Sequence, residues 1–132
     1  MKPKRFVRLF KPQFAEMVRD WLKRQTVRPI PTRMPQPGDV LDARMWSGLP
    51  YRSKQEKLVE AEIVEVRLIH IRHEGICVGG LADGEMLLAS DPQAAVALWA
   101  FAKADGFRDW EEMREWFLKT HGLPFEGILI RW

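Results

Sequence analysis

VEAEIVEVRLIHIR, residues 59–72, carries the clearest secondary-structure pattern in this sequence. It is rich in valine and isoleucine, which favour strands, and charged residues are interleaved with them. We therefore expect one long strand here, and the segments on either side of it decide the fold class.

Upstream of this strand the sequence changes between strand and helix patterns. Residues 5–10 are expected to form a short strand, and a proline at position 12 suits the first turn of a helix whose apolar stripe extends to about Leu22. Several prolines follow and exclude a continued helix, so Gln25 to Ile30 is expected to be extended. A Pro-Gly-Asp turn then leads into a strand over residues 40–46.

Downstream, two helices and a final strand are expected. The first helix begins after Ser90-Asp91, which precede a proline, and Gly106 stops it after about Ala104. The second begins at Asp109, which has a glutamate three residues later in capping-box spacing. Gly127 to Trp132 is expected to be the last strand.

This order of elements lacks the strand–helix alternation of a parallel sheet. The sequence predicts an α+β fold, a small mixed β-barrel with helices packed outside it. A length of 132 residues, without repeats or a long linker, predicts a single domain over residues 1–132.

Composition narrows the class of protein. The lone cysteine, Cys77, cannot form an internal disulfide and favours a reducing compartment. No apolar run approaches the roughly 18 residues that span a bilayer, and Lys11 and Pro12 interrupt the basic start before a signal-peptide core. We expect a soluble cytoplasmic protein with no membrane partner.

Basic residues are concentrated at one end of the sequence. Residues 1–33 hold ten lysines and arginines against two acidic residues, whereas the remainder is acidic and the whole chain has a net charge of +3. Concentrated positive charge suggests an anionic ligand. The alternative is a solvated basic face without a partner.

Familiar catalytic signatures are absent: there is no glycine-rich phosphate loop, HExxH, GxSxG or paired CxxC. His70, His73, Glu74 and Cys77 are close in sequence, but the two histidines fall on opposite faces of a regular strand and converge only at a bend. We therefore expect no metal site and no cofactor, with a partly exposed histidine and a buried thiol at the end of a strand.

The segment Lys23-Arg24-Gln25-Thr26-Val27-Arg28 is the most informative for function. In an extended chain Thr26 and Arg28 project to one face and Val27 to the other. Lys23, at the end of the helix, can reach the same space. A lysine, a hydroxyl and a guanidinium together suit an anion or a carbonyl, and a desolvated lysine can act as base or nucleophile. Exposed basic residues on a sheet edge are the alternative.

A helix, this K-x-x-T-V-R segment and then Pro37-Gly38-Asp39 before a strand resemble the start of ASCH domains, a branch of the PUA-like superfamily. The likeness continues through Ala104-Asp105-Gly106-Phe107 and Asp109-Trp110-Glu111-Glu112-Met113 to the last strand. Trp46 to Gln55 is similar to the version found in small stand-alone bacterial and phage proteins.

The resemblance implies a barrel with a cleft beside the first helix and an RNA or nucleotide ligand. One branch, the acetylcytidine amidohydrolases, uses a lysine, a threonine and a glutamate. The first two match Lys23 and Thr26, and the third falls on Asp105, whose side chain is one methylene shorter. Asp105 then either orients Lys23 or a water, or only caps the chain reversal at Gly106.

Three functions follow from this resemblance. In the first, Lys23 activates water or attacks an acyl carbonyl of acylated cytidine, Thr26 donates to the oxyanion and Asp105 relays a proton. In the second, the domain is a non-catalytic module for single-stranded RNA. In the third it is a metal-independent ribonuclease using the same basic cleft, so whether it is an enzyme stays open.

The loop after residue 46 offers a second set of candidate ligand contacts. Trp46 and Tyr51 are suited to stacking a base, and Arg52 and Lys54 to meeting phosphates, if the loop folds over the cleft. The alternative is a solvated loop with Trp46 in the core. Trp99, Trp110 and Trp116 occur at helical spacings and are expected to be core residues.

Overall fold

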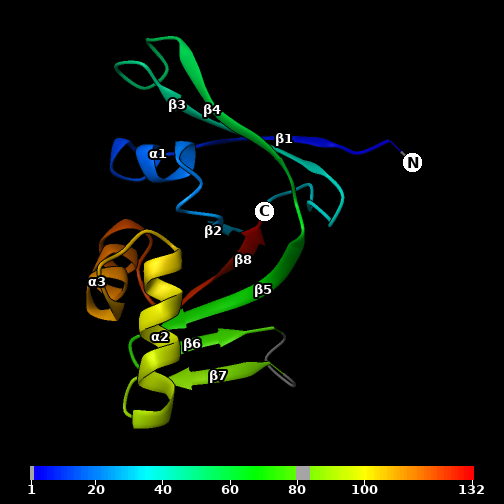
Figure 1. Cartoon of the computed structure of the whole chain (residues 1–132). Helices are drawn as coiled ribbons and strands as arrows, with labels where there is room; N and C mark the ends of the chain where they lie inside the picture. The colour runs from blue at the N-terminus through cyan, green and yellow to red at the C-terminus, as the bar shows by residue number, and fades with distance from the viewer. Residues whose placement is uncertain (1, 80–83) are drawn as a thin grey trace.

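A computed structural model describes residues 2–79 and 84–132, which contain eight strands and three helices (Figure 1). In chain order these elements are β1 (Arg5–Leu9), α1 (Pro12–Arg19), β2 (Gln25–Pro29), β3 (Val40–Trp46), β4 (Gln55–Glu62), β5 (Glu65–Arg72), β6 (Gly75–Val78), β7 (Glu85–Leu88), α2 (Pro92–Ala104), α3 (Trp110–Thr120) and β8 (Phe125–Arg131). No described helix is long and apolar enough to cross a bilayer.

The strands form two sheets. One has the order β1-β3-β4 and the other the order β2-β8-β5-β6-β7. The β1–β3 pair is parallel and every other pair is antiparallel. The α+β class predicted from the sequence is confirmed, whereas no closed barrel is found among the described strands.

The expected long strand over residues 59–72 is wrong, because the chain forms two strands with a bend between them. Ile63 is fully buried, and its N–H donates to the carbonyl of Asp39 at 2.8 Å. The N–H of Val64 donates instead to the carbonyl of Arg131 at 2.8 Å. The chain changes partners here, from β3 to β8, so β4 and β5 join the two sheets (Figure 1).

Helix α1 is shorter than its apolar pattern predicts. It ends at Arg19, and Trp21 has a positive φ of 61°. The N–H groups of Leu22 and Lys23 both donate to the carbonyl of Met17, which turns the chain toward β2. Trp21 and Leu22 are therefore exposed and not part of the expected buried stripe.

The starts of α2 and α3 are confirmed by their caps. A side-chain oxygen of Asp91 accepts from the N–H of Gln93 at 2.9 Å, and one of Asp109 accepts from the N–H of Glu112 at 2.8 Å. Trp99 was expected in the core but is 53% exposed, because it lies on the side of α2 opposite the buried Leu98 and Phe101.

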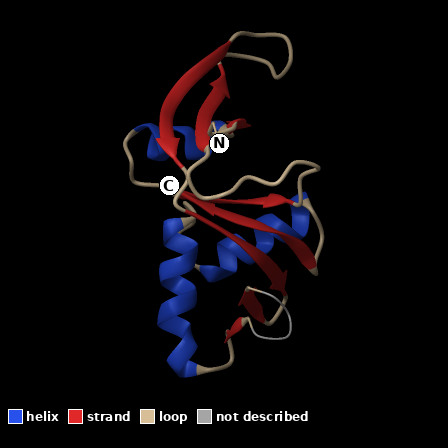
Figure 2. Cartoon of the chain, turned by 90° about the vertical axis from the view of Figure 1, so that its right-hand side faces the viewer, coloured by secondary structure: helices blue, strands red, loops and turns tan. Residues whose placement is uncertain are grey.

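Helices pack on both sheets, and the buried apolar side chains form one core cluster. Helix α1 packs on β3 and β4, while α2 and α3 pack on the five-stranded sheet. Both views show α1 beside the three-stranded sheet and the other helices beside the larger one (Figures 1 and 2). The β3–β4 hairpin projects away from α2 and α3.

Candidate functional site

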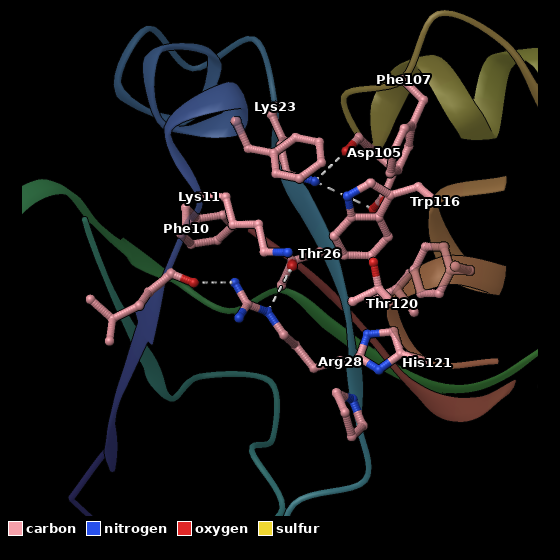
Figure 3. Close-up of a pocket in the computed structure, with 15 residues that line it drawn as sticks. Phe10, Lys11, Lys23, Thr26, Arg28, Asp105, Phe107, Trp116, Thr120 and His121 are labelled. Atoms are coloured by element: carbon pink, nitrogen blue, oxygen red, sulfur yellow. Dashed lines mark hydrogen bonds and ion pairs between the residues drawn. The ribbon is translucent and has the colours of Figure 1, made fainter. Parts of the chain in front are cut away.

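A cavity of about 190 Å³ lies where the ends of several elements meet. Its walls come from the β1–α1 junction, Lys23 and strand β2, the turn between α2 and α3, and the C-terminal half of α3. Lys23, Thr26, Arg28 and Asp105 all line it (Figure 3). The structure thus brings these four predicted residues together, although 82 positions separate Lys23 from Asp105.

Lys23 and Asp105 form a buried pair. The Lys23 Nζ donates to the main-chain carbonyl of Asp105 and lies 3.5 Å from its Oδ1. The side chains are only 3% and 5% exposed. Burial lowers the pKa of Lys23 from its ordinary value and raises the pKa of Asp105, and the charge of each partner opposes these shifts. Both groups are displaced toward their neutral forms.

Gly106 makes this contact possible. The N–H of Phe107 donates to the carbonyl of Ala102, and that of Gly106 to the carbonyl of Lys103, a Schellman ending that leaves the Asp105 carbonyl free for Lys23. The φ of Gly106 is +99°, and an added Cβ would lie 2.9 Å from Cδ1 of Phe14. The glycine predicted to stop the helix therefore also shapes the site.

Thr26 and Arg28 lie on the same face of β2, as expected. The Nε of Arg28 donates to Oγ1 of Thr26 at 3.0 Å, and its Nη2 donates to the carbonyl of Leu9 at 3.0 Å. Because the Thr26 oxygen accepts from Arg28, its own hydroxyl hydrogen is free to point into the cavity. Burial and then the charge of Arg8 lower the pKa of Arg28 to about 10, so it remains protonated at neutral pH.

Gln25 is a site residue that the sequence reasoning missed. Its Nε2 donates to Oδ1 of Asp105 at 3.2 Å, and its Oε1 accepts from Nε of Arg131 at 3.2 Å. Arg131 is held in turn by Glu65 at 2.8 Å. Gln25 is in the segment with the strongest functional pattern, but strand alternation places it opposite Thr26, away from the face considered for the ligand.

Aromatic side chains form much of the remaining wall, and they were not predicted as site residues. The ring centroids of Phe14 and Phe107 are 5.3 Å apart, and those of Phe14 and Trp116 are 5.8 Å apart. Lys11 lies over Trp116, with Nζ 5.1 Å from the ring centroid. His121 also lines the cavity, and burial lowers its pKa from 6.5, so the ring is mostly neutral at pH 7.

The second set of predicted contacts lies elsewhere. Trp46 ends β3 and Tyr51, Arg52 and Lys54 are in the loop that joins it to β4. Trp46 and Tyr51 contact each other, with ring centroids 5.2 Å apart, and Tyr51 is 88% exposed. None of the four is among the described residues that line the cavity, and the β3–β4 hairpin projects away from α3, which forms part of the cavity wall.

The side chains considered as a metal site, those of His70, His73, Glu74 and Cys77, do not meet at one point. His70 and Cys77 are cross-strand neighbours in β5 and β6 and both are buried, whereas His73 and Glu74 are exposed in the turn. Within residues 2–79 and 84–132 there is no group of three or more His, Cys, Asp or Glu side chains arranged to hold a metal.

Comparison of the chain with protein-family models, with curated proteins and with solved structures gives no match. The chemistry of the cavity is therefore inferred from its own groups. A desolvated amine beside a carboxyl group can exchange a proton, and a hydroxyl held by a guanidinium can donate to a developing negative charge. Together with aromatic walls, these groups suit a flat ligand that carries a reactive carbonyl.

Proposed function

We propose that this cavity binds a modified nucleoside of the cytidine type and hydrolyses the amide of its acylated amine. The observation that carries the proposal is the buried Lys23–Asp105 pair opening into the same cavity as Thr26 and Arg28. Perturbed acid–base pairs in a pocket are typical of catalytic sites, because catalysis needs a group that gains and loses a proton near neutral pH.

The proposed reaction needs Lys23 in its neutral form. The amine takes a proton from water as the water oxygen bonds to the acyl carbon, and Thr26 donates its hydroxyl hydrogen to the carbonyl oxygen that becomes negative. The bond from carbon to the exocyclic nitrogen then breaks, and the proton held by Lys23 passes to that nitrogen. Asp105 accepts a hydrogen bond from the ammonium form and so favours the proton transfer to Lys23. The products are a carboxylate, cytidine and one released proton.

The size of the cavity suits part of a nucleotide. Its volume of about 190 Å³ is below the roughly 300–1,000 Å³ of sites that enclose a drug-sized ligand. An acylated base fits this space better than a complete nucleotide. Phe14, Phe107 and Trp116 offer surfaces on which a base can stack. The sugar then stays at the mouth, beside Lys11 and His121.

For the fold, we propose an ASCH domain of the PUA-like superfamily, with the two sheets as parts of one barrel-like unit in a single domain that works in the cytoplasm. The proposal is supported by the order of the elements and by the bent β4–β5 passage that joins the sheets. The resemblance puts Asp105 where the amidohydrolases have a glutamate. The direct contact between Asp105 and Lys23 supports a functional role for the shorter side chain.

The test uses the purified full chain with N⁴-acetylcytidine and, separately, a labelled single-stranded RNA. We expect release of cytidine and acetate with the RNA left intact. Lys23→Met should abolish hydrolysis, while Lys54→Met, which removes an exposed lysine on the hairpin, should leave it unchanged. Intact acetylcytidine would contradict the proposal: binding of RNA without turnover then favours the non-catalytic module, and shortened RNA favours the ribonuclease.

A further inference from the structure

Three arginines lie over the rings of Phe6 and Phe10, and one of them, Arg28, also lines the cavity. Phe6 and Arg8 share one face of β1, because successive strand residues alternate between faces, and Phe10 follows directly after the strand. The guanidinium carbons of Arg33 and Arg8 lie 4.5 and 5.5 Å from the centroid of the Phe6 ring. That of Arg28 lies 4.6 Å from the centroid of the Phe10 ring. We call Arg8, Arg28 and Arg33 the arginine row.

The arginine row has no carboxylate partner within 4 Å among the described residues. Each side chain donates only to neutral groups: Arg8 to the carbonyl of Val7 at 2.8 Å, Arg33 to that of Arg5 at 3.0 Å, and Arg28 to Leu9 and Thr26. These bonds hold the three guanidinium groups in place but do not neutralise them.

The acidic side chains nearest the arginine row, Asp39 and Asp105, already have other hydrogen-bond or ion-pair partners. The carboxylate of Asp39 accepts main-chain hydrogen bonds from Lys4 and Gln36, both at 2.9 Å, although it is close enough to feel the charge of Arg33. Asp105 contacts Lys23 and Gln25 inside the cavity, and its charge also acts on Arg28, although the two do not form an ion pair. Arg5 points elsewhere and is paired with Asp42 and Glu60.

The members of the row repel one another. The charge of Arg33, after burial, lowers the pKa of Arg8, and the charge of Arg8 does the same to Arg28. Arg8 and Arg28 are half-buried and Arg33 is exposed. Like charges held close together lower the stability of the fold unless an anion offsets them. Planar guanidinium groups with fixed donors are well suited to phosphate oxygens.

We propose that the arginine row binds the phosphate groups of a nucleotide chain whose base enters the cavity. This inference rests on the proposed function and specifies its substrate class: an acylated cytidine within single-stranded RNA, for which free N⁴-acetylcytidine is the minimal substrate. Guanidinium groups held together over Phe6 and Phe10 suit neighbouring phosphates, while the small cavity admits only an unpaired base that can leave its stack. The acidic remainder of the chain disfavours a long duplex.

The test measures binding of a fluorescent single-stranded oligocytidylate by anisotropy at several salt concentrations. For single strands each phosphate contact contributes about 0.7 to the slope of log K against log salt. We expect Arg8→Gln/Arg33→Gln to lower this slope by about 1.4 and to weaken binding at least tenfold at low salt. The matched control Arg72→Gln/Arg108→Gln removes the same charge elsewhere and should change affinity less than twofold.

A second measurement keeps the inference testable if the double variant fails to fold. In the wild-type protein, NMR signals of the Arg8 and Arg33 Nε–H groups should shift on addition of cytidine 5′-monophosphate and stay unchanged with cytidine. Equal slopes for the arginine-row and control variants, or unshifted signals with the monophosphate, would overturn the inference.

The outcomes separate this inference from the proposed function. Hydrolysis of free acetylcytidine combined with equal salt slopes would leave the proposed reaction standing and remove the phosphate site. Oligonucleotide binding that depends on Arg8 and Arg33, without any hydrolysis, would retain the phosphate site and remove the reaction. Absence of both results would overturn both.

Discussion

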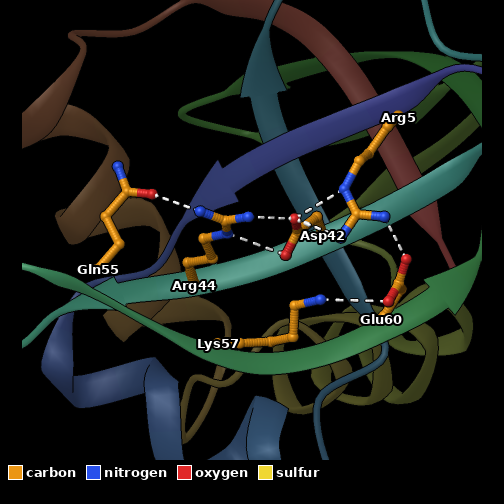
Figure 4. A network of polar contacts seen from close by, with 6 residues as sticks. All are labelled: Arg5, Asp42, Arg44, Gln55, Lys57 and Glu60. Atoms are coloured by element: carbon orange, nitrogen blue, oxygen red, sulfur yellow. Dashed lines mark hydrogen bonds and ion pairs between the residues drawn. The ribbon is translucent and has the colours of Figure 1, made fainter.

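Two buried carboxylates, Asp42 and Asp105, face cations in this protein and have opposite properties. Asp42 is fully buried on β3, and Arg44 binds it through Nε at 3.1 Å and Nη2 at 2.7 Å. Arg5 also contacts Asp42, from Nη2 at 2.8 Å. Arg5 forms a second ion pair with Glu60, which in turn pairs with Lys57 (Figure 4). Asp105 instead meets a single lysine, at 3.5 Å.

The pKa values of Asp42 and Asp105 are shifted in opposite directions because the two carboxylates differ in solvation and in the number of cationic donors that contact them. The guanidinium groups at Asp42 are partly exposed, and their hydrogen bonds, led by that of Arg44, lower the pKa of the carboxylate. At Asp105 burial dominates and raises the pKa, while burial lowers that of Lys23. Asp42 therefore stays ionised and holds β1 to β3, whereas Lys23 and Asp105 are both displaced toward their neutral forms.

The largest expected contrast is in activity. Asp105→Asn should lower kcat/KM for N⁴-acetylcytidine by about 10²- to 10³-fold, because the amide no longer stabilises a protonated Lys23. Asp42→Asn, the same chemical change in the other carboxylate, should alter it less than threefold. Steady-state kinetics on the two folded variants checks this, and equal losses would remove the functional distinction.

The pH dependence of hydrolysis sharpens the same contrast. Lys23 must be neutral, so the rate should rise about tenfold per pH unit until the pH reaches the lowered pKa of Lys23, below its ordinary 10.5. In Asp105→Asn this limb should move to lower pH, because the carboxylate charge favours the ammonium form. A rate that falls as the pH rises from 5 to 9 would contradict Lys23 as the base.

The free energy of unfolding should depend more on Asp42 than on Asp105, the reverse of the order expected for activity. Asp42→Asn should lower the free energy of unfolding by about 1–2 kcal/mol at pH 7, less than for a fully dry pair because both arginines reach solvent. The pKa of Asp42 is depressed, so its contribution is present above its ordinary value of 3.8 and is lost as the pH falls through the folded value. Urea unfolding at pH 7 and pH 3 measures this, and a larger loss for Asp105→Asn at pH 7 would reverse the comparison.

The smallest of these effects concerns the turn that supports Asp105. Gly106→Ala should destabilise the fold by about 1 kcal/mol, because an L side chain is disfavoured at φ +99° and its Cβ crowds Phe14. Gly48→Ala is a matched control, since its added Cβ has ordinary contacts at 3.4 Å from Ser53. Thermal unfolding of both variants tests the point, and equal melting temperatures would show that the turn tolerates a side chain.

Local sequence patterns predicted the parts of the fold that local physics determines. The bounds of β3, the Asp91 and Asp109 caps and the stop at Gly106 follow from propensity, capping and a left-handed turn. Periodicity did not reveal the bend at Ile63, since a change of strand partner leaves the pattern of valine and isoleucine intact. It also placed the exposed Trp99 in the core, because α2 is apolar on both sides.

The candidate site was predictable in its parts but not in its assembly. Strand alternation correctly placed Thr26 and Arg28 on one face, and only the resemblance to ASCH domains connected Asp105 with Lys23. Gln25 was missed because its contact with Asp105 depends on how the α2–α3 turn meets β2. The hairpin residues around Tyr51 were expected near the cleft, but the direction in which a long hairpin projects is set by tertiary packing.

An NMR titration of the Lys23 Nζ in the ¹⁵N-labelled protein tests the central claim most directly, because it measures the proton on the group that the reaction uses. We expect a pKa of Lys23 below the ordinary 10.5 in the wild-type protein and a still lower one in Asp105→Asn. A wild-type pKa at or above 10.5, unchanged by Asp105→Asn, would mean that Lys23 is an ordinary ammonium group and would contradict its assignment as the base.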